Sequence, residues 1–124
     1  MNKRTAYFAH SKRKYNTADE AAELAFIQKH FKGEVICPNN NLGELGGIEP
    51  YLKVIQSTIC VYVSEYFGMI GRGVYHECHF ALTNGINVVA VRKDIKGKFF
   101  VQMVRDVVEI NGNDFIRFGL LITK

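Results

Sequence analysis

The stretch Thr58-Ile59-Cys60-Val61-Tyr62-Val63-Ser64 is the most strand-like part of the sequence. It is rich in β-branched residues and almost wholly apolar, which is typical of strands that are buried on both faces. Glycines interrupt the next segment, 65–73, and residues 74–83 have the pattern of a helix that ends at Asn84-Gly85. The segment 86–92 is again apolar. A strand, a loop, a helix and a second strand in this order predict a parallel β-α-β unit.

Two shorter strands with a helix between them precede this unit. Residues 5–10 and 34–38 have the length and composition of strands. Thr17-Ala18-Asp19-Glu20 is a capping box, in which a hydroxyl and a carboxylate bind the free amides of a helix start. The helix that it opens is expected to end near Phe31. A loop rich in Asn and Gly and then a short helix are predicted at 39–47 and 48–56.

The C-terminal part of the sequence has a different character. Residues 99–110 and 115–123 are rich in strand-forming residues and flank the turn signal Asn111-Gly112-Asn113-Asp114. They predict a β-hairpin at the edge of the sheet, with a helix over 99–108 as the alternative. We therefore expect an α/β fold of the flavodoxin or Rossmann type, a three-layer sandwich with a mostly parallel sheet and a C-terminal β-hairpin.

Length and composition indicate one domain over residues 1–124. The chain is 48% hydrophobic and 23% charged and has two prolines, as is ordinary for a soluble globular protein. Its apolar runs are far shorter than the roughly 20 residues that cross a bilayer, and its first residues do not form a signal peptide. The three cysteines show no paired spacing, which predicts reduced thiols. We expect a cytoplasmic protein with no membrane association.

The net charge of +4 is a modest excess that suits a small anionic ligand or serves solubility alone. A protein that binds long nucleic acid usually shows a denser basic stripe or a recognisable module, and this sequence has neither. His76, Cys78 and His79 are close in sequence, but a metal site needs three or four convergent ligands, and no carboxylate or histidine at a matching spacing completes one. We therefore predict no long nucleic acid as partner, no metal and no cofactor.

Three polar loops are expected to meet at the carboxyl ends of the strands, where open parallel sheets bind ligands. They are residues 10–16, 38–47 and 64–73. The third is the most distinctive, because its glycines would let a ligand approach the backbone and the helix start after it would attract a phosphate or carboxylate. The order G-x-x-G-x-G matches neither the dinucleotide fingerprint nor the Walker loop, so a tight loop without a ligand stays open. The candidate ligand-binding residues in this loop are Ser64, Glu65, Gly68, Gly71, Arg72 and Gly73.

Glu77 lies in the first or second turn of the helix that follows this loop. A carboxylate at that place can face the ligand, either as a nucleophile or as a clamp on sugar hydroxyls. The alternative is a favourable interaction with the helix dipole, which is common for glutamate near a helix start. The preceding glycine loop favours a functional role for Glu77.

The sequence resembles the nucleoside 2-deoxyribosyltransferase-like family, which includes the deoxynucleoside monophosphate N-glycosidases. The resemblance covers about residues 5–92. It rests on a first strand that ends in a polar loop, here Tyr7-Phe8-Ala9-His10-Ser11, on an apolar third strand with a glycine-containing loop after it, and on the segment 73–89 around Glu77. It implies that Glu77 attacks the sugar C1′ and displaces the base, and that water or a second base resolves the glycosyl-enzyme. It also implies that Tyr7 orients Glu77 and that Ser64 and the amides around Gly71 and Gly73 hold a 5′-phosphate or hydroxyl.

The sequence departs from the family at the third strand, where members usually carry an aspartate that contacts the sugar. Glu65 is a possible substitute, and an exposed loop carboxylate is the alternative interpretation. His10 and Tyr15 are candidates for stacking on a base or exchanging a proton, although each residue type is more often a satisfied partner or a surface residue. Asn39 is a candidate for covering the base and is equally plausible as a turn residue.

Three functions follow from these residues. The first is an N-glycosidase or deoxyribosyltransferase that acts on a nucleoside or nucleotide. The second is a non-catalytic protein that binds or sequesters a nucleotide or nucleotide signal, which the missing aspartate favours. The third is an assembly module. We expect a homo-oligomer, with Tyr51, Tyr66 and Phe67 as candidates for the contact face.

Overall fold

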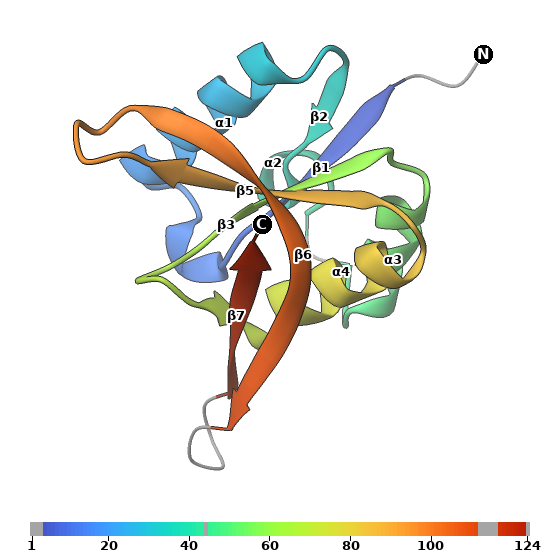
Figure 1. Ribbon diagram of the computed structural model, residues 1–124. Helices are drawn as coiled ribbons and strands as arrows, with labels where there is room; N and C mark the ends of the chain where they lie inside the picture. Colours follow the sequence, from blue (N-terminus) through green and yellow to red (C-terminus); the bar gives the residue numbers. More distant parts are fainter. Residues whose placement is uncertain (1–3, 44, 112–116, 124) are drawn as a thin grey trace.

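The computed structural model describes residues 4–43, 45–111 and 117–123 (Figure 1). Its elements alternate between strands and helices up to residue 93 and end in two long strands. In chain order they are β1 (Thr5–Ala9), the short 3-10 helix η1 (Lys12–Lys14), α1 (Ala18–His30), β2 (Glu34–Ile36), α2 (Pro38–Asn41), α3 (Glu49–Gln56), β3 (Cys60–Ser64), β4 (Ile70–Gly71), α4 (Arg72–Thr83), β5 (Asn87–Lys93), β6 (Phe99–Asn111) and β7 (Arg117–Thr123).

The strands form one mixed sheet in the order β2-β1-β3-β5-β6-β7-β4. The pairs β2-β1, β1-β3 and β3-β5 are parallel. The pairs β5-β6, β6-β7 and β7-β4 are antiparallel. The predicted α/β class is confirmed. The prediction of a mostly parallel sheet in a flavodoxin- or Rossmann-like sandwich is wrong in that only one side of the sheet is parallel.

The change of direction has a local cause in the short connection between β5 and β6. Asp94 closes a tight turn there: its backbone N–H donates to the Lys98 carbonyl, and its carboxylate accepts from the backbone N–H groups of Lys96 and Lys98. A parallel return needs a crossover of a dozen residues or more, so the chain must come back antiparallel. The predicted C-terminal hairpin is confirmed by the β6-β7 pairing, and the alternative helix over 99–108 is wrong. Most of the turn predicted at 111–114 lies outside the described residues.

Strand β6 is long and strongly curved, so it carries β7 away from the parallel strands (Figure 1). The register shifts between Val104 and Asp106, which is an irregularity that bends a strand. The far edge of β7 pairs with β4, which lies in the segment that the sequence predicts to be a loop. Helix α4 then begins at Arg72, two residues earlier than expected. Pairing to a distant strand stabilises β4, and the local sequence carries no signal of it.

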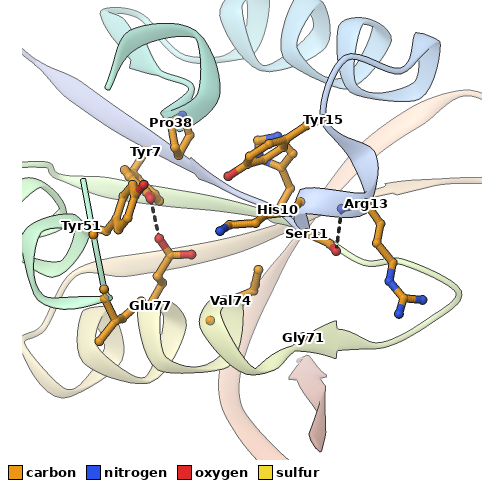
Figure 2. Close-up of a pocket in the computed structure, with 15 residues that line it drawn as sticks. Tyr7, His10, Ser11, Arg13, Tyr15, Pro38, Tyr51, Gly71, Val74 and Glu77 are labelled. Carbon is orange, nitrogen blue, oxygen red and sulfur yellow. Dashed lines mark hydrogen bonds between the residues drawn. The ribbon is translucent and has the colours of Figure 1, made fainter. Parts of the chain in front are cut away.

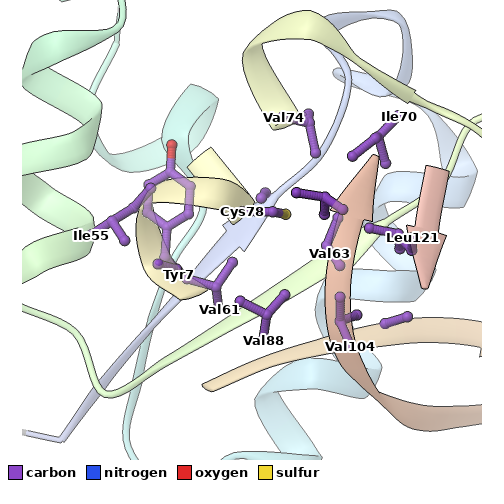
Figure 3. Close-up of a cluster of buried hydrophobic side chains, with 14 residues drawn as sticks. Tyr7, Ile55, Val61, Val63, Ile70, Val74, Cys78, Val88, Val104 and Leu121 are labelled. Atoms are coloured by element: carbon purple, nitrogen blue, oxygen red, sulfur yellow. The ribbon is translucent and has the colours of Figure 1, made fainter. Parts of the chain in front are cut away.

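Helices cover both faces of the parallel strands. Alternate residues of β1 point to opposite faces, so Ala6 and Phe8 pack with α1 in one buried cluster. Tyr7 and Ala9 belong to the other cluster, which lies between the sheet and helices α3 and α4 (Figure 3). This alternation directs the Tyr7 side chain toward α4. The site described below depends on that direction.

The predicted helix start at Thr17 is confirmed. The Thr17 hydroxyl accepts the backbone N–H of Glu20 at 3.2 Å. The Glu20 carboxylate accepts the backbone N–H of Asn16 at 2.9 Å and pairs with His10. Across the part of the chain that is described, no helix is long and apolar enough to span a bilayer.

Candidate functional site

A cavity of about 460 Å³ opens at the carboxyl ends of the parallel strands (Figure 2). Three regions of the chain line it. Strand β1 and the segment after it contribute Tyr7, His10, Ser11, Lys12, Arg13 and Tyr15; the segment from α2 into α3 contributes Pro38, Gly46, Gly47, Ile48 and Tyr51; and α4 with its N-cap contributes Gly71, Gly73, Val74 and Glu77. The predicted convergence of Glu77 with the glycine turn before it is therefore present.

Glu77 and Tyr7 form a buried pair at one end of this cavity. Glu77 lies in the second turn of α4 and is 8% exposed, and Tyr7 lies in the middle of β1 and is fully buried. The Tyr7 hydroxyl donates a hydrogen bond to the Glu77 carboxylate, and Figure 2 shows the two groups pointing toward each other. The contact that the family resemblance implies for these two residues is present. One carboxylate oxygen is held by Tyr7, which fixes the orientation of the other.

Burial sets the protonation of this pair. It raises the pKa of Glu77 from its ordinary value of 4.5 to about 7, against the opposing effect of the Tyr7 hydrogen bond. The pKa of Tyr7 is raised far above its ordinary value, first by burial and then by the charge of Glu77. Tyr7 is therefore a hydrogen-bond donor at every physiological pH. Glu77 is close to half ionised at neutral pH. Carboxyl groups whose pKa is shifted in this way are often functional.

The raised pKa of Glu77 predicts a pH-dependent cost to stability. The folded state binds the Glu77 proton more tightly than the unfolded state does. The stabilisation of the folded state by this proton is therefore complete below pH 4.5 and is lost as the pH rises through about 7. At about 1.4 kcal/mol per pH unit the loss is about 3 kcal/mol. Glu77→Gln removes the titration and keeps an acceptor for Tyr7.

We expect Glu77→Gln and the wild type to unfold with similar free energies at pH 4.5. Above pH 8 the variant should be the more stable by about 3 kcal/mol. Urea unfolding followed by circular dichroism at four pH values from 4.5 to 8.5 measures the difference. If the free energies of unfolding of the two proteins changed with pH in parallel, ionisation of Glu77 would not destabilise the folded state.

The start of helix α4 and two basic side chains also line the cavity. Gly71 is the N-cap of α4 and has no side chain to bind the amides of the first turn, so these N–H groups stay available to an anion. A Cβ added at Gly71 or Gly73 would meet nothing within 4 Å, because both positions face open space. The exposed residues Lys12 and Arg13 line the same cavity.

Two further aromatic side chains, Tyr15 and Tyr51, line the cavity. Burial, and after it the charge of Glu77, raises the pKa of Tyr15 to about 12, so Tyr15 is also a neutral donor. Tyr51 reaches in from α3, and its hydroxyl donates to the Gly43 carbonyl and accepts the Leu45 amide. The flat faces of such rings suit an aromatic base.

His10 lines the cavity, but both nitrogens of its ring are engaged. Nδ1 lies 3.0 Å from the Phe8 carbonyl, and Nε2 lies 2.5 Å from the Glu20 carboxylate. The ring also stacks on Phe8, with a centroid separation of 3.9 Å. His10 is therefore a fixed wall of the cavity, and it has no nitrogen ready to exchange a proton with a ligand.

The structure places the other predicted ligand-binding residues outside the cavity lining. Ser64 is buried and bonded to Lys14 and Glu23. Glu65 pairs with Arg92 at 2.8 Å. Asn39 donates to Glu20, Gly68 lies in the turn between β3 and β4, and Arg72 is the exposed first residue of α4.

Sequence reasoning missed several lining residues. It found the loop 10–16 as a whole but not Ser11, Lys12 and Arg13 as the members that face the cavity. Tyr51 was predicted as a contact-face residue, and the structure places it at the cavity. The helical spacing of α3 carries a signal for its buried face, but not for which cavity that face borders.

Comparison with protein-family models, with curated proteins and with solved structures found no match to this chain.

Proposed function

We propose that the protein is an N-glycosidase or deoxyribosyltransferase that cleaves the base–sugar bond of a nucleoside or nucleotide. The observation that supports this most directly is the Glu77 carboxyl. It is buried at the cavity, held by Tyr7 and close to its midpoint at neutral pH. Its ionised form is a nucleophile in a poorly solvated site, and the cavity has the size of a small-molecule site.

In the proposed reaction the ionised Glu77 oxygen that Tyr7 does not hold forms a bond to the sugar C1′. The C1′–N bond breaks, its electron pair leaves with the base, and the base takes up a proton from solvent. The product is a glycosyl ester of Glu77. Water or a second base attacks the same carbon and gives up a proton to solvent, and the carboxylate is released with net retention of configuration.

The electrostatics of the cavity favour one orientation of the substrate. A 5′-phosphate or hydroxyl fits at the start of α4, near Gly71, Gly73 and Arg13, where the helix amides and the basic side chain attract negative charge. The sugar then lies over Glu77. The base lies toward Tyr15, which Figure 2 shows reaching into the cavity with its hydroxyl toward Glu77.

Removing the Tyr7 hydroxyl tests the nucleophile through its pH dependence. The Tyr7 hydrogen bond lowers the pKa of Glu77, so Tyr7→Phe is expected to raise that pKa further. A hydrogen bond to a charged group is worth roughly 1.5–3 kcal/mol, which moves the rising limb of base release to higher pH by roughly one to two units. Tyr62→Phe is the matched control, because the Tyr62 hydroxyl contacts His30. If the rising limb of the Tyr7→Phe profile lay at the wild-type pH, the ionisation of Glu77 would not be the cause of that limb.

A second candidate function is binding without cleavage. Among the described residues that line the cavity, Glu77 is the one carboxylate. Glu65, which the sequence offers as a sugar-binding carboxylate, is engaged with Arg92. A cavity with a single acidic group suits a protein that binds or sequesters a nucleotide signal.

A ligand panel distinguishes the two functions. The protein is incubated with nucleosides, deoxynucleoside monophosphates and NAD-type dinucleotides, and free base is measured by chromatography beside the thermal midpoint. Base release from one class supports the glycosidase. A raised thermal midpoint without base release supports the binding protein, because a ligand of the folded state stabilises it by mass action. If no ligand gave either base release or a raised thermal midpoint, the assembly module would be the remaining function.

The homo-oligomer and the cytoplasmic location belong to the same proposal. Four apolar side chains of β6 are 38–41% exposed and are candidates for contacts between subunits: Phe100, Met103, Val108 and Ile110. The thiols of Cys37, Cys60 and Cys78 are unpaired, which suits a reducing compartment.

A further inference from the structure

Three potential metal ligands lie together behind one wall of the cavity, and we call them the His10–Glu20–Cys37 cluster. The imidazole, carboxylate and thiol ligand atoms all lie within 4.8 Å of one another. All three residues are buried, with exposed fractions of 4%, 5% and 1%. They come from three elements: His10 follows β1, Cys37 follows the neighbouring parallel strand β2, and Glu20 lies in the first turn of α1.

The groups around the cluster hold the ligand atoms in position. The Nδ1 atom of His10 lies 3.0 Å from the Phe8 carbonyl, so the imidazole presents Nε2 to the cluster. A backbone carbonyl on the second nitrogen is the usual support of a metal-binding histidine. The second oxygen of Glu20 accepts hydrogen bonds from the Asn16 amide and the Asn39 side chain. The Cys37 thiol donates to the side-chain amide oxygen Oδ1 of Asn39 at 3.2 Å.

Glu20 is diverted from its helix to serve this cluster. In a capping box the glutamate at this position returns to the backbone N–H of the cap residue. Here Glu20 binds the N–H of Asn16, one residue earlier, and turns its other oxygen to His10. A local departure of this kind is expected where a side chain has a further role.

We propose that His10, Glu20 and Cys37 bind one divalent transition-metal ion, with zinc as the ion whose preferences they match. Nitrogen, oxygen and sulfur ligands together are typical of zinc, and three protein ligands leave a fourth position for water. The ion ties the ends of β1 and β2 to the start of α1. Since His10 and Pro38 line the cavity, the ion stabilises that wall.

Metal binding requires a small rearrangement of the cluster. His10 Nε2 and Glu20 Oε2 lie 2.5 Å apart and hold each other directly. Zinc bonds of about 2.0–2.3 Å in a tetrahedron separate neighbouring ligands by roughly 3.3–3.8 Å. The carboxylate must therefore move back by about 1 Å, and the thiol must lose its proton. The inference is independent of the proposed function, because no step at Glu77 involves the ion.

The test uses full-length protein stripped with a chelator and titrated with Zn²⁺ alone and with Co²⁺ alone. We expect one equivalent of Zn²⁺ by calorimetry, a raised thermal midpoint, and a thiolate-to-Co²⁺ charge-transfer band in the near ultraviolet. Cys37→Ser should remove the band and weaken Zn²⁺ binding by at least about a hundredfold. Cys60→Ser is the matched control and should keep both, because Cys60 lies on β3 outside the cluster.

Two further variants keep the proposal falsifiable. Glu20→Gln retains the shape of the side chain. It should weaken Zn²⁺ binding as Cys37→Ser does, and it replaces that variant if Cys37→Ser fails to fold. The double variant His76→Gln/His79→Gln removes two exposed histidines of α4 that could bind metal adventitiously. The proposal is overturned if wild-type protein binds neither ion. It is equally overturned if binding survives in Cys37→Ser and Glu20→Gln, or is lost in the α4 double variant.

Discussion

Glu77→Gln is expected to abolish base release while the protein still binds its nucleotide. The substitution keeps the size of the side chain and an acceptor for the Tyr7 hydroxyl, so the cavity should retain its shape. It removes the charge and the nucleophilic oxygen that the proposed reaction needs. Loss of a catalytic nucleophile lowers turnover by a factor on the order of 10⁴ or more. Chromatography of free base under single-turnover conditions measures the effect.

The control is a carboxylate of the same kind outside the cavity lining. Glu49 is exposed at the start of α3, and Glu49→Gln should release base at the wild-type rate. Ligand binding by Glu77→Gln is followed through its thermal midpoint, which should rise with substrate as in the wild type. Base release by Glu77→Gln within tenfold of the wild-type rate would exclude Glu77 as the nucleophile.

Much of the fold is predictable because its signals are local. The apolar run 58–64 becomes the central strand β3, and Thr17 caps α1 as its hydroxyl predicts. The sequence does not predict how much of the sheet is antiparallel, because the partner of a strand is set by residues far away in the chain. Strand β4 is the clearest case, since two residues in a glycine-rich segment become a strand only by pairing with β7.

The candidate site was predictable only in part, for a related reason. Glu77 and the glycines Gly71 and Gly73 lie close in sequence on one helix start, so their convergence follows from helix geometry. Ser64 ends the strand that points toward the same region, yet it is bonded to Lys14 of η1, 50 residues earlier in the sequence. The identity of such a partner is a property of the folded chain, and no spacing rule reveals it.

Lys14 is the buried cation that holds η1 against the sheet. Its ammonium lies 2.8 Å from the Glu23 carboxylate and donates to the Ser64 hydroxyl at 2.6 Å. The Lys14 and Glu23 side chains are only 8% and 10% exposed, so water solvates neither charge well. Ser64 in turn donates to Glu23 at 2.6 Å. The three side chains thereby join η1, α1 and the end of β3.

Lys14→Met is therefore expected to lower the free energy of unfolding by about 3–5 kcal/mol, because it leaves the Glu23 carboxylate buried without its counterion. Methionine keeps the length of the stem, so lost packing is a minor part of the effect. The double variant Lys14→Met/Glu23→Leu removes both charges and should recover most of the loss, since an apolar pair can replace a buried ion pair at little cost. Urea unfolding of the three proteins measures both differences. Equal losses in the single and double variants would mean that Lys14 stabilises the fold by packing and not by its charge. Helix η1 presents Lys12 and Arg13 to the cavity, and it would then be held by apolar contacts.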